Sequence, residues 1–259
     1  MIKLTKKNIR LQIKKNKKIY FAGDFHFGRP NKDDSLSREK KVINWLNSIS
    51  SDAQDVFLLG DLFDFWFEYK NVIPKENLRF LAKISDMIDK GINFHYFLGN
   101  HDMWALNYFS ELGIQVYNDP EEFIIGDKTI LVGHGDGIGK GDFGYKVLKK
   151  VFFRNKIFEY LYRWIHPDIG ISLGRYFSGT KKAMDVNENA ETNDKRIVNY
   201  CKDYYKYRKV NVFIFGHSHF KNKCTIAEDS VYYNCGEWIN GSSYLEYDSK
   251  KFQLLDFKN

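Results

Sequence analysis

The 259-residue sequence lacks any run of 18 apolar residues, so it offers no candidate for a transmembrane helix. Its N-terminal stretch is rich in lysine and has no apolar h-region, so we expect no secretory signal there. No lipidation motif is evident either, because Gly does not follow Met1 and the sequence closes on Asp256-Phe257-Lys258-Asn259. A protein that spans the membrane or is anchored to it by lipid is therefore not expected.

Cysteine is scarce, with only 3 in the chain: Cys201, Cys224 and Cys235. The number is odd and the spacing fits no metal-binding motif, which argues against a disulfide framework and against a cysteine-rich zinc site. We expect reduced thiols and a cytoplasmic location.

Acidic residues are outnumbered, and the net charge is +7. Such a surplus is often only a well-solvated surface, but it also suits an anionic partner, either nucleic acid or a membrane.

Five short motifs hold most of the polar residues that could carry chemistry, and they contain five of the 7 histidines. They are Asp24-Phe25-His26, Gly60-Asp61 with Asp64, Gly99-Asn100-His101-Asp102, Gly133-His134, and Gly216-His217-Ser218-His219.

Each motif follows an apolar run that predicts a strand buried on both faces. The runs are Ile19 to Ala22, Val56 to Leu59, Phe94 to Leu98, Ile130 to Val132, and Val212 to Phe215. Within two motifs the paired residues are two apart, so on an extended segment they point the same way. We therefore expect the motifs to converge at the carboxyl ends of the strands, on one edge of an α/β sheet.

The residue types in these motifs suit a pair of divalent metal ions. Two ions roughly 3.5–4 Å apart can clamp the oxygens of a phosphoryl group and lower the pKa of a water between them. Carboxylate, amide and imidazole donors without cysteine favour Mn²⁺ or a similar first-row metal. The motifs predict a metal-dependent phosphoesterase, although any one of them alone would be weak support.

Together the motifs resemble the calcineurin-like metallophosphoesterases, whose pattern is D-x-H, G-D-x-x-D, G-N-H-D/E, G-H and G-H-x-H. The resemblance covers roughly the whole chain and implies a four-layer α-β-β-α sandwich, with residues 1–259 as a single domain. It implies one metal held by Asp24, His26, Asp61 and His219, and a second held by Asp61, Asn100, His134 and His217. Asp61 would bridge the two metals, His101 would face the phosphate, and Asp64 or Asp102 would orient His101.

Between the fourth motif and a final helix expected at 194–209 lies a basic, aromatic segment. Residues 140–165 predict one long amphipathic helix, and residues 171–184 predict a second. We expect an insertion at about 141–193 that overhangs the metal edge as a helical lid with an aromatic wall. The alternative is a helix that packs on the sheet as ordinary core.

Within the family, the chain looks like the branch that hydrolyses UDP-2,3-diacylglucosamine, a nucleotide-diphosphate glycolipid of lipid A biosynthesis, to UMP and 2,3-diacylglucosamine 1-phosphate. The resemblance implies substrate contacts from Asn100, Asp142, Tyr145, Arg175, Ser178 and Lys182. It further implies peripheral association with the anionic inner membrane. The best-known members carry Arg where this chain has His101, which leaves the substrate open.

Two rival interpretations remain. A phosphodiesterase or nuclease would use the basic segment to track nucleic-acid phosphates, but the apolar content of the lid argues against a nucleic-acid partner. A non-catalytic scaffold on the same fold would be expected to have lost metal ligands, and every ligand position is filled here.

Overall fold

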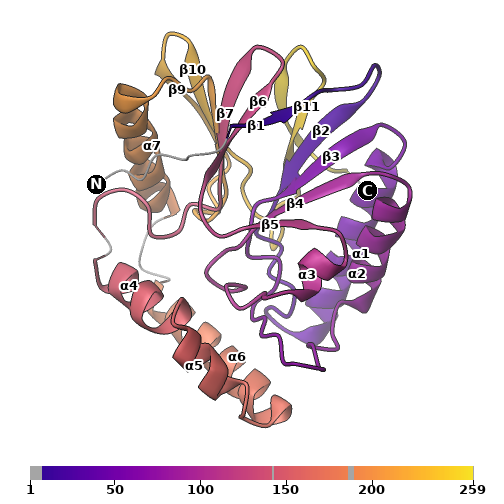
Figure 1. The fold of residues 1–259 in the computed structure, drawn as a ribbon, viewed down its shortest axis with the longest axis vertical. Coiled ribbons are helices and arrows are strands. Elements are labelled where there is room, and N and C mark those ends of the chain that lie inside the picture. The colour runs from indigo at the N-terminus through magenta and orange to yellow at the C-terminus, as the bar shows by residue number, and fades with distance from the viewer. Residues whose placement is uncertain (1–7, 142, 186–189, 259) are drawn as a thin grey trace.

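Two six-stranded sheets stack face to face in the computed structural model (Figure 1). The structure describes residues 8–141, 143–185 and 190–258, without the side chains of Asn8 and of 179–185. In order across the first sheet lie β1 (Asn8–Leu11), β6 (Glu121–Ile125), β7 (Lys128–Val132), β8 (Val212–Phe215), β10 (Ser230–Asn234) and β9 (Asn222–Ala227). In order across the second lie β12 (Phe252–Asp256), β11 (Ser243–Tyr247), β2 (Lys18–Ala22), β3 (Ala53–Leu58), β4 (Asn93–Phe97) and β5 (Gln115–Tyr117).

Helices cover the outer face of each sheet (Figure 1). The second sheet carries α1 (Lys32–Ile49) and α2 (Leu78–Asp89), with the short α3 (Tyr108–Glu111) near β5, and the first sheet carries α7 (Ala190–Tyr207). Three apolar clusters separate the layers, one between the sheets and one beneath the helices on each side. The predicted four-layer α-β-β-α sandwich is confirmed.

The apolar runs of the sequence become strands with two buried faces, as expected. In β2, Phe21 faces the cluster between the sheets, whereas Tyr20 faces the cluster beneath α1 and α2. On β3, Phe57 likewise faces the cluster between the sheets, and Val56 faces the cluster beneath the helices. Both faces of these strands are largely apolar and covered, and the functional motifs follow the strand ends.

The expected long helix at 140–165 is wrong. The segment forms α4 (Phe143–Leu148), a π-helical turn η1 (Lys149–Phe153) and α5 (Lys156–Tyr162). The break falls at Asn155, whose backbone is extended and whose side chain accepts a hydrogen bond from Ile157 N. Asparagine stabilises a helix start more than a helix interior, so it begins a new helix here.

The second lid helix, α6 (Pro167–Asp185), begins four residues earlier than the sequence suggested. Proline is favoured at the first turn of a helix, where its missing N–H costs nothing. The helix lies close to the loop after β3, because a Cβ added at Gly174 would come within 2.2 Å of the Phe65 ring. The final helix, expected at 194–209, is α7.

The lid is not ordinary core, because none of the residues of α4, η1 and α5 is buried. These elements and α6 lie below the sheets in Figure 1, and they contact the sandwich at its loops, for example where Trp104 Nε1 donates to Phe153 O. The three cysteines are free thiols. Over the described residues, no helix has the length and apolar character needed to cross a membrane.

Candidate metal centre

The five motifs meet at one edge of the sandwich, as expected from strands that run in parallel. Asp24 and His26 follow β2, Asp61 follows β3, and Asn100 follows β4. From the other sheet, His134 follows β7, and His217 and His219 follow β8. Residues almost 200 positions apart thereby become neighbours, such as His26 and His219.

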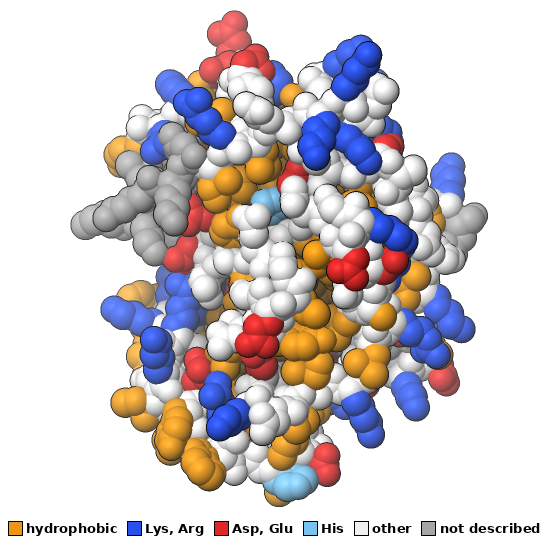
Figure 2. All heavy atoms as spheres, turned by 45° about the vertical axis from the view of Figure 1, so that its right-hand side comes forward, with side chains coloured by type: hydrophobic (Ala, Val, Ile, Leu, Met, Phe, Trp, Pro, Cys, Tyr) orange, Lys and Arg blue, Asp and Glu red, His pale blue; other side chains and the backbone are white. Residues whose placement is uncertain are grey.

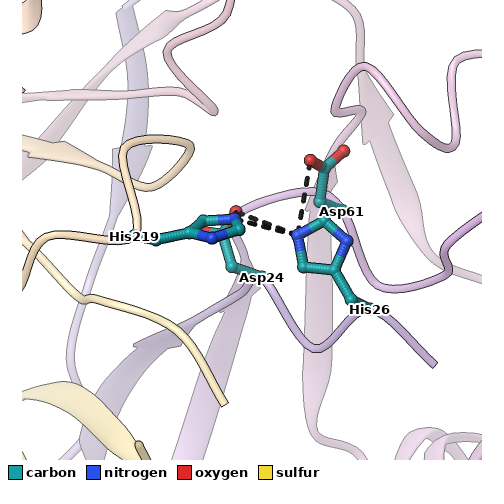
Figure 3. A group of neighbouring side chains, drawn as sticks. All are labelled: Asp24, His26, Asp61 and His219. Atoms are coloured by element: carbon teal, nitrogen blue, oxygen red, sulfur yellow. Dashed lines mark hydrogen bonds and ion pairs between the residues drawn. The ribbon is translucent and has the colours of Figure 1, made fainter. Parts of the chain in front are cut away.

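A first cluster contains Asp24, His26, Asp61 and His219, whose donor atoms lie within 4.8 Å of one another. In Figure 3 the two imidazole rings point toward each other between the carboxylates. The His26 and His219 Nε2 atoms are 2.9 Å apart. Asp24 Oδ1 lies 3.3 Å from His219 Nε2, and Asp61 Oδ2 lies 3.7 Å from His26 Nε2.

A second cluster contains Asp61, His134 and His217, again with donor atoms within 4.8 Å. Asp61 Oδ2 is 3.5 Å from His134 Nε2. The Asn100 side-chain oxygen lies 3.4 Å from the same nitrogen. Asp61 is thus the one residue shared by the two clusters, in the position expected of a bridging carboxylate.

The tautomer of His134 is set by a backbone carbonyl. His134 Nδ1 lies 2.6 Å from Leu59 O, which can only accept a hydrogen bond, so Nδ1 carries the hydrogen. In the neutral ring this leaves the Nε2 lone pair directed at Asp61, which is the arrangement of a metal-binding histidine.

Burial and mutual charge shift the protonation of the clusters in the metal-free protein. Burial and the neighbouring His219 lower the pKa of His26 well below its usual value. Burial and His134 lower the pKa of His217 to about 4. Burial alone would lower the pKa of His134, but the Asp61 carboxylate raises it to about 10. A metal ion bound by His134 would displace a proton.

The backbone is strained where the candidate ligands sit. Asp24, His26, Asp61, His217 and His219 all have positive φ, between 45° and 67°. Residues with a Cβ seldom adopt this left-handed conformation, and such strain persists mainly at functional sites. Five of the candidate ligands share it, which indicates that the loops are shaped to aim side chains inward.

Three glycines of the motifs lie so close to side chains of other loops that a Cβ would not fit. A Cβ at Gly99 would lie 2.1 Å from Asp61 Oδ1, and one at Gly216 would lie 2.5 Å from Asp24 Oδ2. At Gly60 a Cβ would lie 2.5 Å from His134 Nδ1, and φ there is +92°. Each loop passes directly against a carboxylate or imidazole of another loop, so only glycine fits.

His101 lies beside both clusters. Its Nδ1 is 2.8 Å from Asp64 O and 2.9 Å from Ser178 Oγ on α6. The carbonyl fixes the hydrogen on Nδ1, so Nε2 faces the clusters, 4.0 Å from Asp61 Oδ2. His101 also forms a third group of close donors with His26 and Asp64.

The two carboxylates expected to orient His101 have different contacts. Asp64 contacts the ring through its backbone oxygen, while its carboxylate lies 3.4 Å from Arg29 Nε. The Asp102 carboxylate accepts hydrogen bonds from Leu62 N and Gly99 N at 2.7 Å and 2.6 Å. Asp102 therefore ties two motif loops together and does not contact the His101 ring.

Several supporting residues were missed by the sequence analysis. Buried Arg38 on α1 donates to His26 O at 2.8 Å and so holds the first motif loop. Asp194 on α7 accepts from Ser218 Oγ at 3.1 Å, and Asn234 donates to Gly216 O at 2.8 Å, so both brace the last motif. These residues belong to no motif, and only Asn234, a polar residue at the end of an apolar strand, carries a local signal in the sequence.

The predicted lid residues do not form one binding face. Tyr145 donates to Asp136 Oδ2 at 2.6 Å, and Arg175 pairs with Glu76 at 3.0 Å. Ser178 is buried and reaches His101, although its neighbour Arg175 on the same helix points to solvent and to Glu76. Asp142 lies outside the described residues, as does the side chain of Lys182.

An apolar cavity of about 440 Å³ opens beside His101 and Asn100, beneath the lid. It is lined by Asp64, Phe65, Trp66, Asn100, His101, Met103, Trp104, Leu148, Phe152, Phe153, Phe158, Tyr162, Gly174, Phe177 and Ser178. Its walls come from η1, α5 and α6 on the lid and from the loops after β3 and β4 on the sandwich. We call it the apolar pocket.

The donor set fits a pair of divalent metal ions. Buried imidazoles and carboxylates converge without thiolates, and His26 Nε2 and His219 Nε2 face each other at a distance that an intervening cation would stabilise. A carboxylate shared by two such clusters at the strand ends of a four-layer sandwich is typical of a metal-dependent hydrolase.

The chain belongs to the calcineurin-like phosphoesterases, whose family model matches residues 17–221. The resemblance based on the motifs is confirmed, and the protein is a metal-dependent hydrolase.

One relative, named UDP-2,3-diacylglucosamine hydrolase, from Porphyromonas gingivalis, is 31% identical over 92% of this chain and 96% of its own length. A relative of the same name from Aliivibrio fischeri is 25% identical over 91% of this chain and 97% of its own length. A solved structure of Vacuolar Protein Sorting 29 from Cryptosporidium parvum aligns with TM-score 0.44 and 11% identity over 94% of this chain and 98% of its own.

Proposed function

We propose that this chain hydrolyses UDP-2,3-diacylglucosamine, releasing UMP and 2,3-diacylglucosamine 1-phosphate, in the biosynthesis of lipid A. The observation that carries the proposal is the apolar pocket, which reaches from His101 and Asn100 into the lid. A pocket with aromatic and aliphatic walls suits acyl chains, and its polar end meets the donor clusters, where a phosphate group would react. The names of the relatives support the same substrate.

The metal ligands proposed are Asp24, His26, Asp61 and His219 for one ion, and Asp61, Asn100, His134 and His217 for the other. Mn²⁺ is the ion that the mixture of oxygen and nitrogen donors favours. When bound, two such ions supply electrostatic clamping of phosphoryl oxygens and an acidified water. We assign Asp61 as the shared ligand because its Oδ2 lies near imidazoles of both clusters.

Side chains that do not bind the metals stabilise charge on the phosphoryl group and position the site. His101 presents Nε2 toward the clusters and stabilises charge on the phosphoryl group, because Asp64 O fixes its tautomer. Asp64 and Ser178 position the ring, and Asp102 holds the loops that carry Asp61 and Asn100. The lid excludes water from the acyl chains.

Residues 1–259 form a single domain in this proposal, and the insertion at about 141–193 is its lid. The lid elements come between β7 and α7 in the chain and share the apolar pocket with the sandwich. Asp142 and Tyr145 are assigned to the head group of the substrate, and Lys182 to its sugar phosphate. The ion pair of Arg175 with Glu76 would have to open for Arg175 to contact the substrate as well.

A turnover assay tests the substrate. Purified protein loaded with Mn²⁺ is given UDP-2,3-diacylglucosamine, bis-p-nitrophenyl phosphate and single-stranded DNA in parallel. We expect UMP release from the lipid to have the highest kcat/KM and to need detergent. Cleavage of the DNA with no turnover of the lipid would support the nuclease interpretation and overturn the proposal.

We also assign the protein to the cytoplasmic face of the inner membrane, bound peripherally. A stripe at i, i+3, i+4 and i+7 spacing runs along α5 and the turn that follows it, formed by Ile157, Tyr160, Leu161 and Trp164, which are 57–75% exposed. Figure 2 shows hydrophobic side chains beside Lys and Arg at the lower end of the molecule, where Figure 1 places α5 and α6. An exposed apolar stripe on a chain of net charge +7 suits an anionic lipid surface.

Vesicle flotation tests the membrane assignment. The wild-type protein should float with vesicles that contain phosphatidylglycerol and less with phosphatidylcholine alone. The pair of substitutions Ile157→Ser and Trp164→Ser should abolish flotation while detergent-assisted activity stays near that of the wild type. Flotation that is unchanged in this variant would show that the stripe does not bind membranes.

A further inference from the structure

A second cavity, of about 370 Å³, lies on the other side of the lid's first arm. It is lined by Phe97, Leu98, Tyr117, Asn118, Asp119, Pro120, His134, Gly135, Asp136, Gly137, Ile138, Lys146, Lys149, Lys150 and Arg154. We call it the basic pocket. It shares His134 with the second donor cluster, whereas the apolar pocket shares His101 and Asn100 with the centre.

The arm formed by α4 and η1 separates the two pockets. Leu148, Phe152 and Phe153 line the apolar pocket. Lys149 and Lys150, which lie between Leu148 and Phe152 in the chain, line the basic pocket. This short stretch of chain therefore places apolar side chains in the apolar pocket and lysine side chains in the basic pocket.

Positive charge remains in the basic pocket after its internal pairs are counted. Lys149 pairs with Asp136 at 2.5 Å, and Arg154 pairs with Asp119 at 2.9 Å. Lys150 makes no ion pair within the part of the chain that the structure describes, and Lys146 donates to a backbone oxygen of Gly139. Two cations, Lys146 and Lys150, are thus left for an anionic ligand.

The floor of the basic pocket is partly aromatic. The Tyr117 ring stacks on Phe97 with centroids 4.7 Å apart and planes at 16°, and Pro120 and Ile138 line the pocket beside them. Asn118 and Asp119 add an amide and a carboxylate. A flat apolar surface with hydrogen-bonding groups and cations at its rim has the recognition elements of a nucleotide: a base, a ribose and a phosphate.

We propose that the basic pocket binds the nucleoside monophosphate half of the substrate and retains UMP as the leaving product. The inference rests on the proposed function, because a nucleotide-diphosphate glycolipid has one polar and one apolar half. The two pockets flank the donor clusters, so the pyrophosphate would lie over the centre. The acyl chains would lie on the His101 side and the uridine on the His134 side.

Inhibition by UMP tests this inference without the lipid. Hydrolysis of bis-p-nitrophenyl phosphate by the Mn²⁺-loaded protein is measured with increasing UMP, ribose 5-phosphate or inorganic phosphate. Direct titration calorimetry with the same three probes covers the case in which the small substrate is turned over slowly. UMP should bind more tightly than either fragment by roughly tenfold, since each added contact contributes of the order of one hydrogen bond.

Charge reversal locates the binding. Lys150→Glu should weaken UMP binding on the order of tenfold, because it places a like charge beside the phosphate. The matched control, Lys156→Glu, makes the same change at an exposed lysine on α5 that lines neither pocket. UMP binding that equals that of inorganic phosphate, or equal losses in both variants, would overturn the inference.

The two proposals fail separately. Tight UMP binding that depends on Lys150, in a protein that does not cleave the lipid, would keep the nucleotide pocket and reject the lipid substrate. Turnover of the lipid by a protein whose UMP binding is insensitive to Lys150→Glu would keep the function and reject this pocket.

Discussion

His101 Nδ1 lies 2.9 Å from Ser178 Oγ, so the lid helix α6 directly touches the residue that faces the metal centre. Ser178 Oγ also donates to Asp64 O at 2.8 Å, the same oxygen that lies 2.8 Å from His101 Nδ1. Three groups from three segments thus form a closed triangle. The position of the lid and the orientation of the imidazole are coupled through it.

The first prediction is that Ser178→Ala lowers kcat by about tenfold or less, because one hydrogen bond contributes ~0.5–1.5 kcal/mol and Asp64 O still holds the ring. Metal content should stay at the wild-type value. The control is Ser172→Ala on the exposed side of α6, whose hydroxyl bonds only within the helix. Kinetics on a small phosphodiester check the effect, and equal rates in both variants would contradict a positioning role for Ser178.

The second prediction concerns His101 itself. His101→Ala should reduce kcat by about 10²–10⁴, as expected for a group that stabilises transition-state charge. Two ions per chain should remain after Mn²⁺ loading, as measured by elemental analysis. Since His101 also forms a third donor group with His26 and Asp64, a drop in metal content would instead identify it as a ligand.

The proposed metal ligands were the part of the site that the sequence predicted most directly. Their chemistry demands particular residue types, and the strands before them are marked by apolar runs, so Asp61 or His134 can be placed at a strand end without a structure. The family likeness adds the partition into two clusters, with Asp61 shared.

The lid could be predicted only in outline. Its helical content and aromatic character were evident in the sequence. The break at Asn155 was not, because it depends on a single N-cap hydrogen bond within a segment whose amphipathic pattern is continuous. Trp164 is 75% exposed and lines neither pocket, whereas Phe158 and Tyr162 line the apolar pocket. Which side of a helix faces the sandwich is decided by contacts with distant residues such as Phe65 and Trp104.

Supporting residues such as Arg38 could not be predicted from the sequence, because their contacts also depend on tertiary packing. Arg38 contacts His26 O across a turn of chain whose path is set by the packing of α1 on the sheet. A buried arginine in a helix of mixed composition has the same local appearance as an exposed one, so sequence patterns do not distinguish the two.

The third prediction tests the close approach of two motif loops. Gly99→Ala would place a Cβ 2.1 Å from Asp61 Oδ1, so the carboxylate must move. We expect reduced metal content and a loss of activity of at least about 100-fold, as when a catalytic group is displaced by about 1 Å. Gly144→Ala on α4 is the control, because a Cβ there has nothing within 4 Å. Full metal content in Gly99→Ala would show that the loop can adjust.

The fourth prediction concerns the shared carboxylate. Asp61→Ala should leave fewer than two ions bound after Mn²⁺ loading and lower the rate by orders of magnitude. The fold should persist, because Asp61 lies at the sheet edge and outside the three apolar clusters. Elemental analysis and far-UV circular dichroism on one preparation check both parts. Two ions retained in this variant would rule out a bridging role for Asp61.

The last prediction separates the acyl pocket from the chemistry. Phe152, Phe158 and Phe177 line the apolar pocket, and none of them is a member of the donor clusters. Replacing each with Ser removes apolar area from the pocket without altering the reacting centre, so binding energy remote from the phosphate is lost. The three variants should raise KM for UDP-2,3-diacylglucosamine, and activity on bis-p-nitrophenyl phosphate should stay within about twofold of the wild type.

Phe143→Ser supplies the matched control, since Phe143 belongs to the same lid, is 79% exposed and lines neither pocket. Its KM for the lipid should match that of the wild type when both are assayed in detergent. Parallel losses on both substrates in the pocket variants would mean that the aromatic residues support the structure of the centre. An unchanged KM for the lipid would remove the observation on which the lipid substrate rests, because the apolar pocket is what distinguishes acyl chains from any other group carried by a phosphate ester.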